Sequence, residues 1–211
     1  MAELPLAVSA VIVNYNAREH LAKCVNSLRR EGVSQIVVVD NGSSDGSKEA
    51  LETVDPGAVF LAQRHNSGYG AAANRGAEAT EGEAVLICNP DVEMLPGALR
   101  TMIGSLAADT ALGVVGPKIL DREGNLYPSA RTFPSLVDSI GHGFIGLVQP
   151  DNPFSRRYKM ESWDHRNAQA VDWVSGACFL ARREALDSVG GFDESYFMYM
   201  EDVDLCWRAR R

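Results

Sequence analysis

Short apolar runs alternate with amphipathic stretches along the first half of the chain. Residues 8–13 are nearly all apolar and rich in valine, a run too short for a helix and suited to a strand covered on both faces. The next apolar positions recur at the i, i+3, i+4, i+7 spacing of a helix with one buried stripe. They are Leu21, Cys24, Val25 and Leu28.

The same unit of strand and helix then repeats. Further strands are predicted at 36–39, 59–62 and 84–88, and further helices at 48–54, 70–79 and 95–106. Strands that alternate with helices through residue 115 predict an α/β fold, with a mostly parallel central sheet flanked by helices on both faces.

The pattern changes after Pro117. Residues 121–170 contain scattered prolines and aromatics without a sustained period, which predicts a loop-rich insertion or a second half. Order resumes with a strand-like run at 171–180 and a short helix at 182–188. A final helix is expected from near Glu201 to Arg211.

The composition is that of a globular protein, with 45% hydrophobic and 23% charged residues among 211. Its 20 basic and 28 acidic residues give a net charge of −8, which disfavours a protein that coats nucleic acid or an anionic membrane. The N-terminus lacks a basic residue before its apolar run, and no apolar run approaches the roughly 20 residues of a membrane helix. We therefore expect a cytoplasmic protein, soluble or at most peripheral to a membrane, with no nucleic-acid partner.

The four cysteines are far apart in the sequence and flanked by apolar residues, without a C-x-x-C pair. This pattern predicts reduced thiols in the core of a cytosolic protein, and neither a disulfide framework nor a zinc site.

Polar clusters follow each of the four predicted strands, where open parallel sheets bind their ligands. A tyrosine next to an amide and a carboxylate, as in Tyr15, Asn16 and Asp40, suits a pyrimidine. The ring would stack on the base, and the carboxylate would accept a hydrogen bond from the base N3–H. The alternative is that Asp40 and Asn41 only cap the next helix.

Asp91 and Glu93 follow the fourth strand and could bind a divalent cation that also grips a diphosphate. Mg²⁺ and related ions commonly take one or two protein carboxylates and complete their shell with phosphate oxygens and water. The alternative is an acidic pair that stabilises a helix N-terminus.

The segment 196–204 places three carboxylates after five large apolar or aromatic residues. A carboxyl group against a hydrophobic wall has a raised pKa and is suited to act as a general base. The alternative is an ordinary acidic first turn of a helix.

Gly68 to Ala73 fit the pattern G-x-G-x-x-A of dinucleotide-binding proteins, but the match is isolated and follows the third strand. We interpret the glycines as allowing close backbone approach to a ligand, with Arg64, His65, Asn74 or Arg75 available for phosphate. A nicotinamide-dependent oxidoreductase is the distant alternative. Residues 154–160 hold three cations among aromatics and could meet a lipid headgroup or a phosphorylated acceptor, or form an ordinary solvated loop.

Five blocks taken in order resemble the family-2 inverting glycosyltransferases, which have the GT-A nucleotide-diphospho-sugar fold. The blocks are VSAVIVNYNA at 8–17, VVVDNGSSDGS at 37–47, NSGYGAAANRG at 66–76, LICNPDVE at 86–93 and the run at 174–208. Within the family, the sequence is similar to bacterial rhamnosyltransferases that use dTDP-L-rhamnose. The resemblance implies transfer of rhamnose to a GlcNAc-diphospho-polyprenol in cell-wall or surface-polysaccharide synthesis.

The resemblance also implies the roles of individual residues. Residues 1–115 would form the donor-binding half and 116–211 the acceptor-side half. Asp202 would be the general base, Glu201 would line the acceptor site, and Asp91 and Glu93 would hold Mg²⁺ or Mn²⁺. The donor-binding residues would be Tyr15, Asn16, Asp40, Asn66, Gly68, Asn74, Asn89 and Asp91.

The chain departs from the family in two respects. The metal motif is often D-x-D, whereas the aligned triplet here is Asn89-Pro90-Asp91, so Glu93 or water must complete the shell. Relatives continue beyond the Glu-Asp pair, so we expect the chain to be a C-terminally truncated enzyme. The alternatives are a family-2 transferase with another nucleotide-sugar, or a catalytically silent nucleotide-binding fragment.

Overall fold

A sheet of six strands in the order β3-β2-β1-β4-β10-β5 forms the centre of the molecule. The computed structural model describes residues 5–133, 160 and 163–211. The strands are β1 (Val8–Asn14), β2 (Gln35–Asp40), β3 (Val59–Ala62), β4 (Ala84–Cys88), β5 (Val114–Val115) and β10 (Cys178–Arg182). The first four are parallel, whereas β10 runs antiparallel to both β4 and β5. The predicted α/β class with a mostly parallel sheet is therefore confirmed.

The strand order places a topological switch point between β1 and β4. The chain winds outward from β1 through β2 to β3, and then returns to the other side of β1 to form β4. Because these strands are parallel, Asn14, Asp40 and the loop after Cys88 lie at the same edge of the sheet. This edge is the usual place for a ligand in an open α/β sheet.

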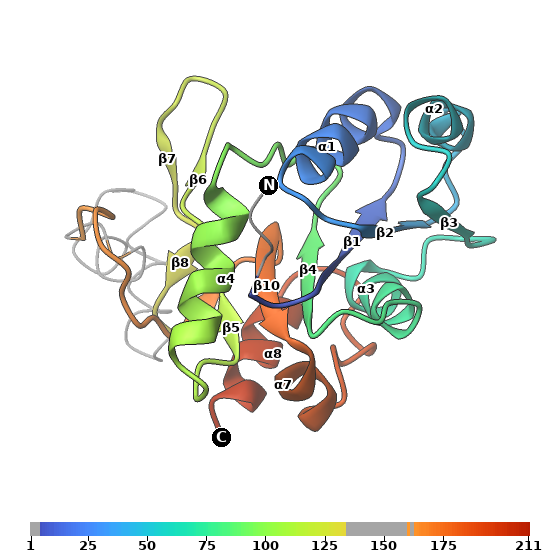
Figure 1. The fold of residues 1–211 in the computed structure, drawn as a ribbon. Coiled ribbons are helices and arrows are strands. Elements are labelled where there is room, and N and C mark those ends of the chain that lie inside the picture. Colours follow the sequence, from blue (N-terminus) through green and yellow to red (C-terminus); the bar gives the residue numbers. More distant parts are fainter. Residues whose placement is uncertain (1–4, 134–159, 161–162) are drawn as a thin grey trace, which may run out of the picture.

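Helices cover both faces of the sheet, with α1 and α2 on one side of the strands and α3 on the other (Figure 1). Their bounds are α1 (Arg18–Arg30), α2 (Ser47–Val54), α3 (Tyr69–Glu78), α4 (Ala98–Ala108), α7 (Arg183–Ser188) and α8 (Glu201–Ala209). Successive side chains of a strand point to opposite faces, so a strand covered on both sides is apolar throughout. All of β1 is buried, including the polar Ser9 and Asn14, as its nearly continuous apolar run predicts.

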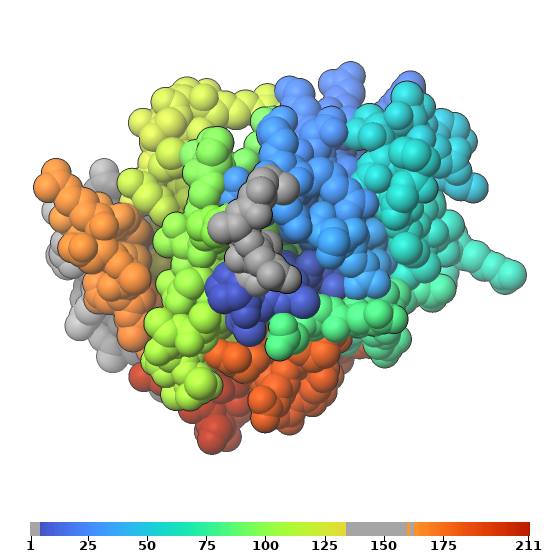
Figure 2. Space-filling model, viewed as in Figure 1, coloured from blue at the N-terminus to red at the C-terminus, as the bar shows by residue number. Residues whose placement is uncertain are grey.

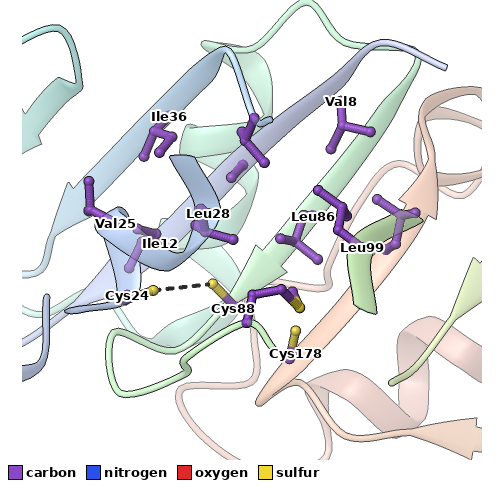
Figure 3. Packing of buried hydrophobic residues seen from close by; sticks show 14 of the residues in the cluster. Val8, Ile12, Cys24, Val25, Leu28, Ile36, Leu86, Cys88, Leu99 and Cys178 are labelled. Carbon is purple, nitrogen blue, oxygen red and sulfur yellow. Dashed lines mark hydrogen bonds between the residues drawn. The ribbon is translucent and has the colours of Figure 1, made fainter. Parts of the chain in front are cut away.

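Two hydrophobic clusters result, one on each face. Ile12 of β1 belongs to the cluster formed with α1, α2 and α4, in which Leu28 and Leu99 are fully buried (Figure 3). Val11, its neighbour in sequence, belongs to the cluster formed with α3, α7 and α8, together with Phe179 of β10. The central sheet is thus the shared wall of both clusters.

Helix α4 begins at Ala98, three residues later than the sequence pattern suggests, because the residues before it cannot continue a helix. Pro96 precedes Gly97, which adopts a left-handed φ of 83° at the N-cap. The carboxylate of Glu31 accepts hydrogen bonds from the N–H groups of Gly97 (2.9 Å) and Leu99 (3.2 Å). A side chain from the end of α1 therefore caps α4.

The strand-like run at 171–180 is divided between two sheets. β9 (Trp173–Val174) pairs with β8 (Ala130–Arg131), and β10 pairs with β4 in the central sheet. The link of residues 175–177 lies between them, and Gly176 removes side-chain bulk there. The predicted single strand was therefore wrong at this link.

The predicted loop-rich region contains a small antiparallel hairpin, β6 (Ile119–Leu120) with β7 (Leu126–Tyr127). The hairpin lies at the upper left of the surface in view, and the segment between β3 and α3 projects at the right (Figure 2). Residues 154–159, with their cations, lie outside the described residues. Within the described parts of the chain, no helix is long and apolar enough to cross a membrane.

Candidate active site

The carboxylate of Asp40 organises the turn after β2. It is buried and accepts hydrogen bonds from the Asn14 amide (2.7 Å), from the Ser43 hydroxyl (2.5 Å) and from the Ser43 N–H (2.9 Å). Helix α2 has Gly46 as its N-cap, without a side-chain capping bond. Asp40 and Asn41 therefore do not cap that helix, and base binding by Asp40 stays a prediction.

Tyr15 and Asn16 lie beside this turn. Asn16 adopts a left-handed φ of 50°, and its side-chain oxygen accepts a hydrogen bond from the Ser44 N–H at 2.9 Å. Ser43 in turn accepts one from the Asn16 N–H at 2.9 Å. Tyr15 is 53% exposed, so its ring is accessible for stacking. These bonds join the loop after β1 to the loop after β2, at the carboxyl ends of the two strands.

The loop before α3 is hydrogen-bonded to the loop after β2. Asn41 is buried and donates from its amide to the Gly68 carbonyl (3.1 Å), and Asn66 accepts a hydrogen bond from the Gly68 N–H (2.9 Å). Gly68 has a φ of 92°, and a Cβ at this position would overlap the Phe197 carbonyl. The glycine thus lets the segment before α8 approach the loop closely.

Asn74 holds the loop at 192–194. Its amide nitrogen donates to the Phe192 carbonyl (2.9 Å) and to Glu194 (3.0 Å), and its oxygen accepts from the Phe192 N–H (2.8 Å). The Asn74 side chain therefore stabilises the loop at 192–194. Its placement near the diphosphate stays a prediction.

Asn89, Asp91 and Glu93 follow β4 at the same edge. Asp91 is exposed, and a single accessible carboxylate fits a hard cation shared with a diphosphate. Glu93 instead faces Lys23 of α1, with 4.0 Å between the ammonium nitrogen and a carboxylate oxygen. Among the described residues, no three His, Cys, Asp or Glu side chains gather as a metal site. The residues present therefore fit a metal held chiefly by Asp91 and the donor, with the exposed Glu93 as a second carboxylate nearby.

Glu201 and Asp202 are the first two residues of α8. Asp202 is half-buried, and its oxygens accept hydrogen bonds from the N–H groups of Gly176 (2.8 Å) and Val203 (2.9 Å). Glu201 is 6% exposed, and burial, with a smaller contribution from the charge of Asp202, raises its carboxyl pKa. The two neighbouring carboxyl groups therefore have different surroundings, one held by fixed donors and one desolvated.

Two further residues at this site were not singled out from the sequence. The Tyr69 hydroxyl donates to the Gly176 carbonyl, and the Gly176 N–H donates to Asp202. The next residue, Ala177, accepts a hydrogen bond from the Asn89 N–H at 2.9 Å. The 175–177 link thus joins the loop after β4 to the start of α8. Tyr69 and Gly176 lie within the sequence blocks at 66–76 and 174–208, where neither was assigned a function.

The family model described as Glycosyl transferase family 2 matches residues 9–190, which include the strand-end loops described above. The chain belongs to glycosyl transferase family 2. The family and the GT-A fold expected from the sequence are both confirmed.

Among the family members it resembles is the N-acetylglucosaminyl-diphospho-decaprenol L-rhamnosyltransferase of Mycobacterium tuberculosis. The two are 38% identical over 208 residues, which cover 92% of this chain and 67% of the relative. The rhamnosyltransferase WbbL of Escherichia coli is 26% identical over 95% of this chain and 76% of its own length.

Solved structures support the fold. A mannosyltransferase from Pyrobaculum calidifontis, in complex with GDP-Man and Mn²⁺, superposes with a TM-score of 0.65 at 18% identity and covers 95% of this chain. TarS from S. aureus superposes with a TM-score of 0.60 at 17% identity over 96% of this chain. This chain spans about half the length of each, 50% and 54% respectively.

Proposed function

We propose that this protein is an inverting rhamnosyltransferase that uses dTDP-L-rhamnose as the donor and a GlcNAc-diphospho-polyprenol as the acceptor. The donor and acceptor are inferred from the 38% identical mycobacterial relative, whose name states the sugar and the lipid-linked saccharide. Such an acceptor would bring the protein to the cytoplasmic face of a membrane as a peripheral enzyme.

One observation carries the proposal for the mechanism. The 175–177 link bonds to Asn89, in the expected donor loop, and to Asp202, the expected base. Both bonds support a site in which the base and the leaving group act on one sugar. One in-line displacement with inversion requires the base on one side of that sugar and the leaving group on the other. Asp202 would take the proton of the acceptor hydroxyl as that oxygen attacks the anomeric carbon, and the nucleoside diphosphate would leave.

The remaining residues would bind and orient the substrates. Tyr15 would stack on the base and Asp40 would orient it, while Asn66, Gly68 and Asn74 would lie along the ribose and diphosphate. Asp91 would hold Mg²⁺ or Mn²⁺ against the diphosphate. When bound, the ion would supply positive charge that stabilises the leaving group. Glu201 would line the acceptor site.

The experiment measures donor binding and transfer separately. Calorimetry with dTDP and Mn²⁺ should detect binding to the folded wild-type chain, and Asp91→Ala should weaken it at least tenfold. Asp202→Asn should keep dTDP binding and lose transfer of labelled rhamnose by a factor of about 100 or more, the scale of general-base catalysis. Glu184→Gln, an exposed carboxyl change on α7, is the matched control and should alter neither quantity.

Each part of the proposal has an outcome that contradicts it. Absence of dTDP binding by the folded chain would reject the donor site, and a screen of other nucleotide-sugars would then identify the donor base. Full turnover by Asp202→Asn would reject its role as base. Binding of dTDP without any transfer by the wild-type chain would instead favour the second candidate, a catalytically silent nucleotide-binding module.

A further inference from the structure

Tyr69 occupies the junction between the donor loop and the segment that leads into α8. Its backbone N–H donates to the Phe197 carbonyl at 3.1 Å, and its ring packs edge-on against Phe192 with the centroids 6.0 Å apart. Its hydroxyl donates to the Gly176 carbonyl. One residue therefore contacts the segment before α8 and the 175–177 link at the same time.

Gly176 passes this contact on to Asp202 through the two peptide groups that flank its Cα. Its carbonyl accepts from Tyr69, and its N–H donates to the Asp202 carboxylate at 2.8 Å. A Cβ on Gly176 would lie 3.3 Å from the Tyr69 ring and 3.6 Å from Asp202, so there is little room between the two side chains. The carbonyl and the N–H belong to adjacent peptide groups joined at the Gly176 Cα, so a shift of the Gly176 backbone would move the donor of Asp202.

The surroundings of Tyr69 keep its hydroxyl protonated and available as a donor. Burial raises the pKa of this phenol well above its usual value, and nearby Cys88, Cys178, Glu201 and Asp202 raise it further. A hydroxyl that remains protonated can hold the Gly176 carbonyl at every working pH.

We propose that Tyr69 is a positioning residue that fixes the Asp202 carboxylate through the backbone of Gly176. The inference rests on the proposed function, because it assumes that Asp202 acts as the base. In this proposal Tyr69 acts through Asp202 and not on a reacting atom. Since the same residue adjoins Gly68 of the donor loop, the position of the base depends on the loop expected to bind the donor.

The first test replaces Tyr69 by Phe, which keeps the ring against Phe192 and removes the hydroxyl only. We expect kcat to fall about tenfold, while the KM for the donor and dTDP affinity change less than twofold, because catalysis is sensitive to small misplacements of a catalytic group. Tyr127→Phe, on the exposed hairpin strand β7, is the control and should leave kcat unchanged. Unchanged kcat in Tyr69→Phe, or an equal loss of dTDP affinity, would overturn the proposal.

A double-mutant cycle tests whether Tyr69 acts through Asp202. Asp202→Glu keeps a carboxylate but extends it beyond the Gly176 N–H, so Tyr69→Phe should reduce kcat less than twofold further in that background. A full tenfold further loss would show that the two residues act independently and would overturn the proposal.

Hydrogen exchange separates failure of the inference from failure of the proposed function. In Tyr69→Phe, the Gly176 amide should exchange at least fivefold faster than in wild type, while the Leu180 amide in β10 should be unchanged. An unchanged Gly176 rate would overturn the positional coupling even in an active enzyme. A wild-type chain without transferase activity would overturn the proposed function, whereas the Gly176 rate would still report the coupling itself.

Discussion

Glu201 is the side chain whose chemistry depends most directly on its burial. It is 6% exposed, and among the described residues its Oε2 atom has no hydrogen-bond partner. Burial raises its carboxyl pKa, and the neighbouring charge of Asp202 adds to this effect. A carboxyl group in this condition favours the protonated form.

The raised pKa makes a prediction about stability. A group with a raised folded-state pKa contributes stability that is fully present below its unfolded pKa, about 4.3 for glutamate, and is lost as pH rises through the folded value. Glu201→Gln stays neutral at every pH, so its stability should not decrease in this way as pH rises. We expect the variant to be at least as stable as wild type at pH 7 and to lose that advantage below about pH 4, as measured by urea unfolding at several pH values.

The control for this prediction is Glu184→Gln, which changes an exposed glutamate of α7. The stability difference between this variant and wild type should show no such pH trend. A Glu201→Gln variant that is less stable than wild type at pH 7 would show that the charged carboxylate is stabilised by contacts in the folded chain.

Helices α3 and α4 each contain an interior glycine, but the two helices pack differently. A Cβ on Gly76 of α3 would overlap Val11 of β1 and lie 3.0 Å from Val39 of β2. A Cβ on Gly104 of α4 would meet nothing within 4 Å. The first glycine therefore sets how closely α3 lies on the sheet, and the second does not.

The two glycines provide a matched pair of substitutions. Gly76→Ala should lower the free energy of unfolding by about 1–3 kcal/mol, the usual cost of overpacking a core. Gly104→Ala should raise it by about 0.5–1 kcal/mol, because alanine favours a helix over glycine. Urea unfolding measures both, and equal effects of the two substitutions would contradict the packing argument.

At the scale of the whole molecule, the core joins thiols that are far apart in the sequence. Cys24 of α1 lies with its sulfur 4.0 Å from that of Cys88 in β4, and Cys178 of β10 is paired in register with Cys88 (Figure 3). All three are free and buried. A hydrogen bond with Cys24 and burial raise the pKa of Cys88 well above its usual range, and burial raises that of Cys178.

This arrangement predicts slow thiol chemistry in the native state. Thiolates are the reactive form, so buried thiols with raised pKa values react only when the structure opens. We expect the three core cysteines to react with DTNB at least about 100-fold more slowly in buffer than in urea, and at one common rate. Burial raises the pKa of Cys206 to about 11, so this half-buried thiol should also react slowly.

A cysteine introduced at exposed Thr110 serves as the control and should react at the rate of a free thiol. Rapid labelling of one core cysteine alone would indicate local opening of its element and would contradict a single cooperative core.

Much of the fold followed from local sequence patterns. The strand at residues 8–13 and the helix around Leu21 to Leu28 were predicted correctly, because each buried face leaves a periodic signal within a few residues. The boundary of α4 and the break between β9 and β10 were not, because Glu31 and the partner strand β8 that decide them are remote in the sequence.

The residue pattern alone predicted the order of elements from β1 to α4, the polar groups at the strand ends, and the membership of glycosyl transferase family 2. Which of those groups meet depends on how the elements pack in three dimensions. The reversed direction of β10, the engagement of Asn74 with the loop at 192–194, and the hydrogen bond between Tyr69 and Gly176 are of this kind. Tyr69 and Gly176 are 107 residues apart, and a hydrogen bond across that distance leaves no periodic trace, because its partners are chosen by packing and not by neighbours in the chain.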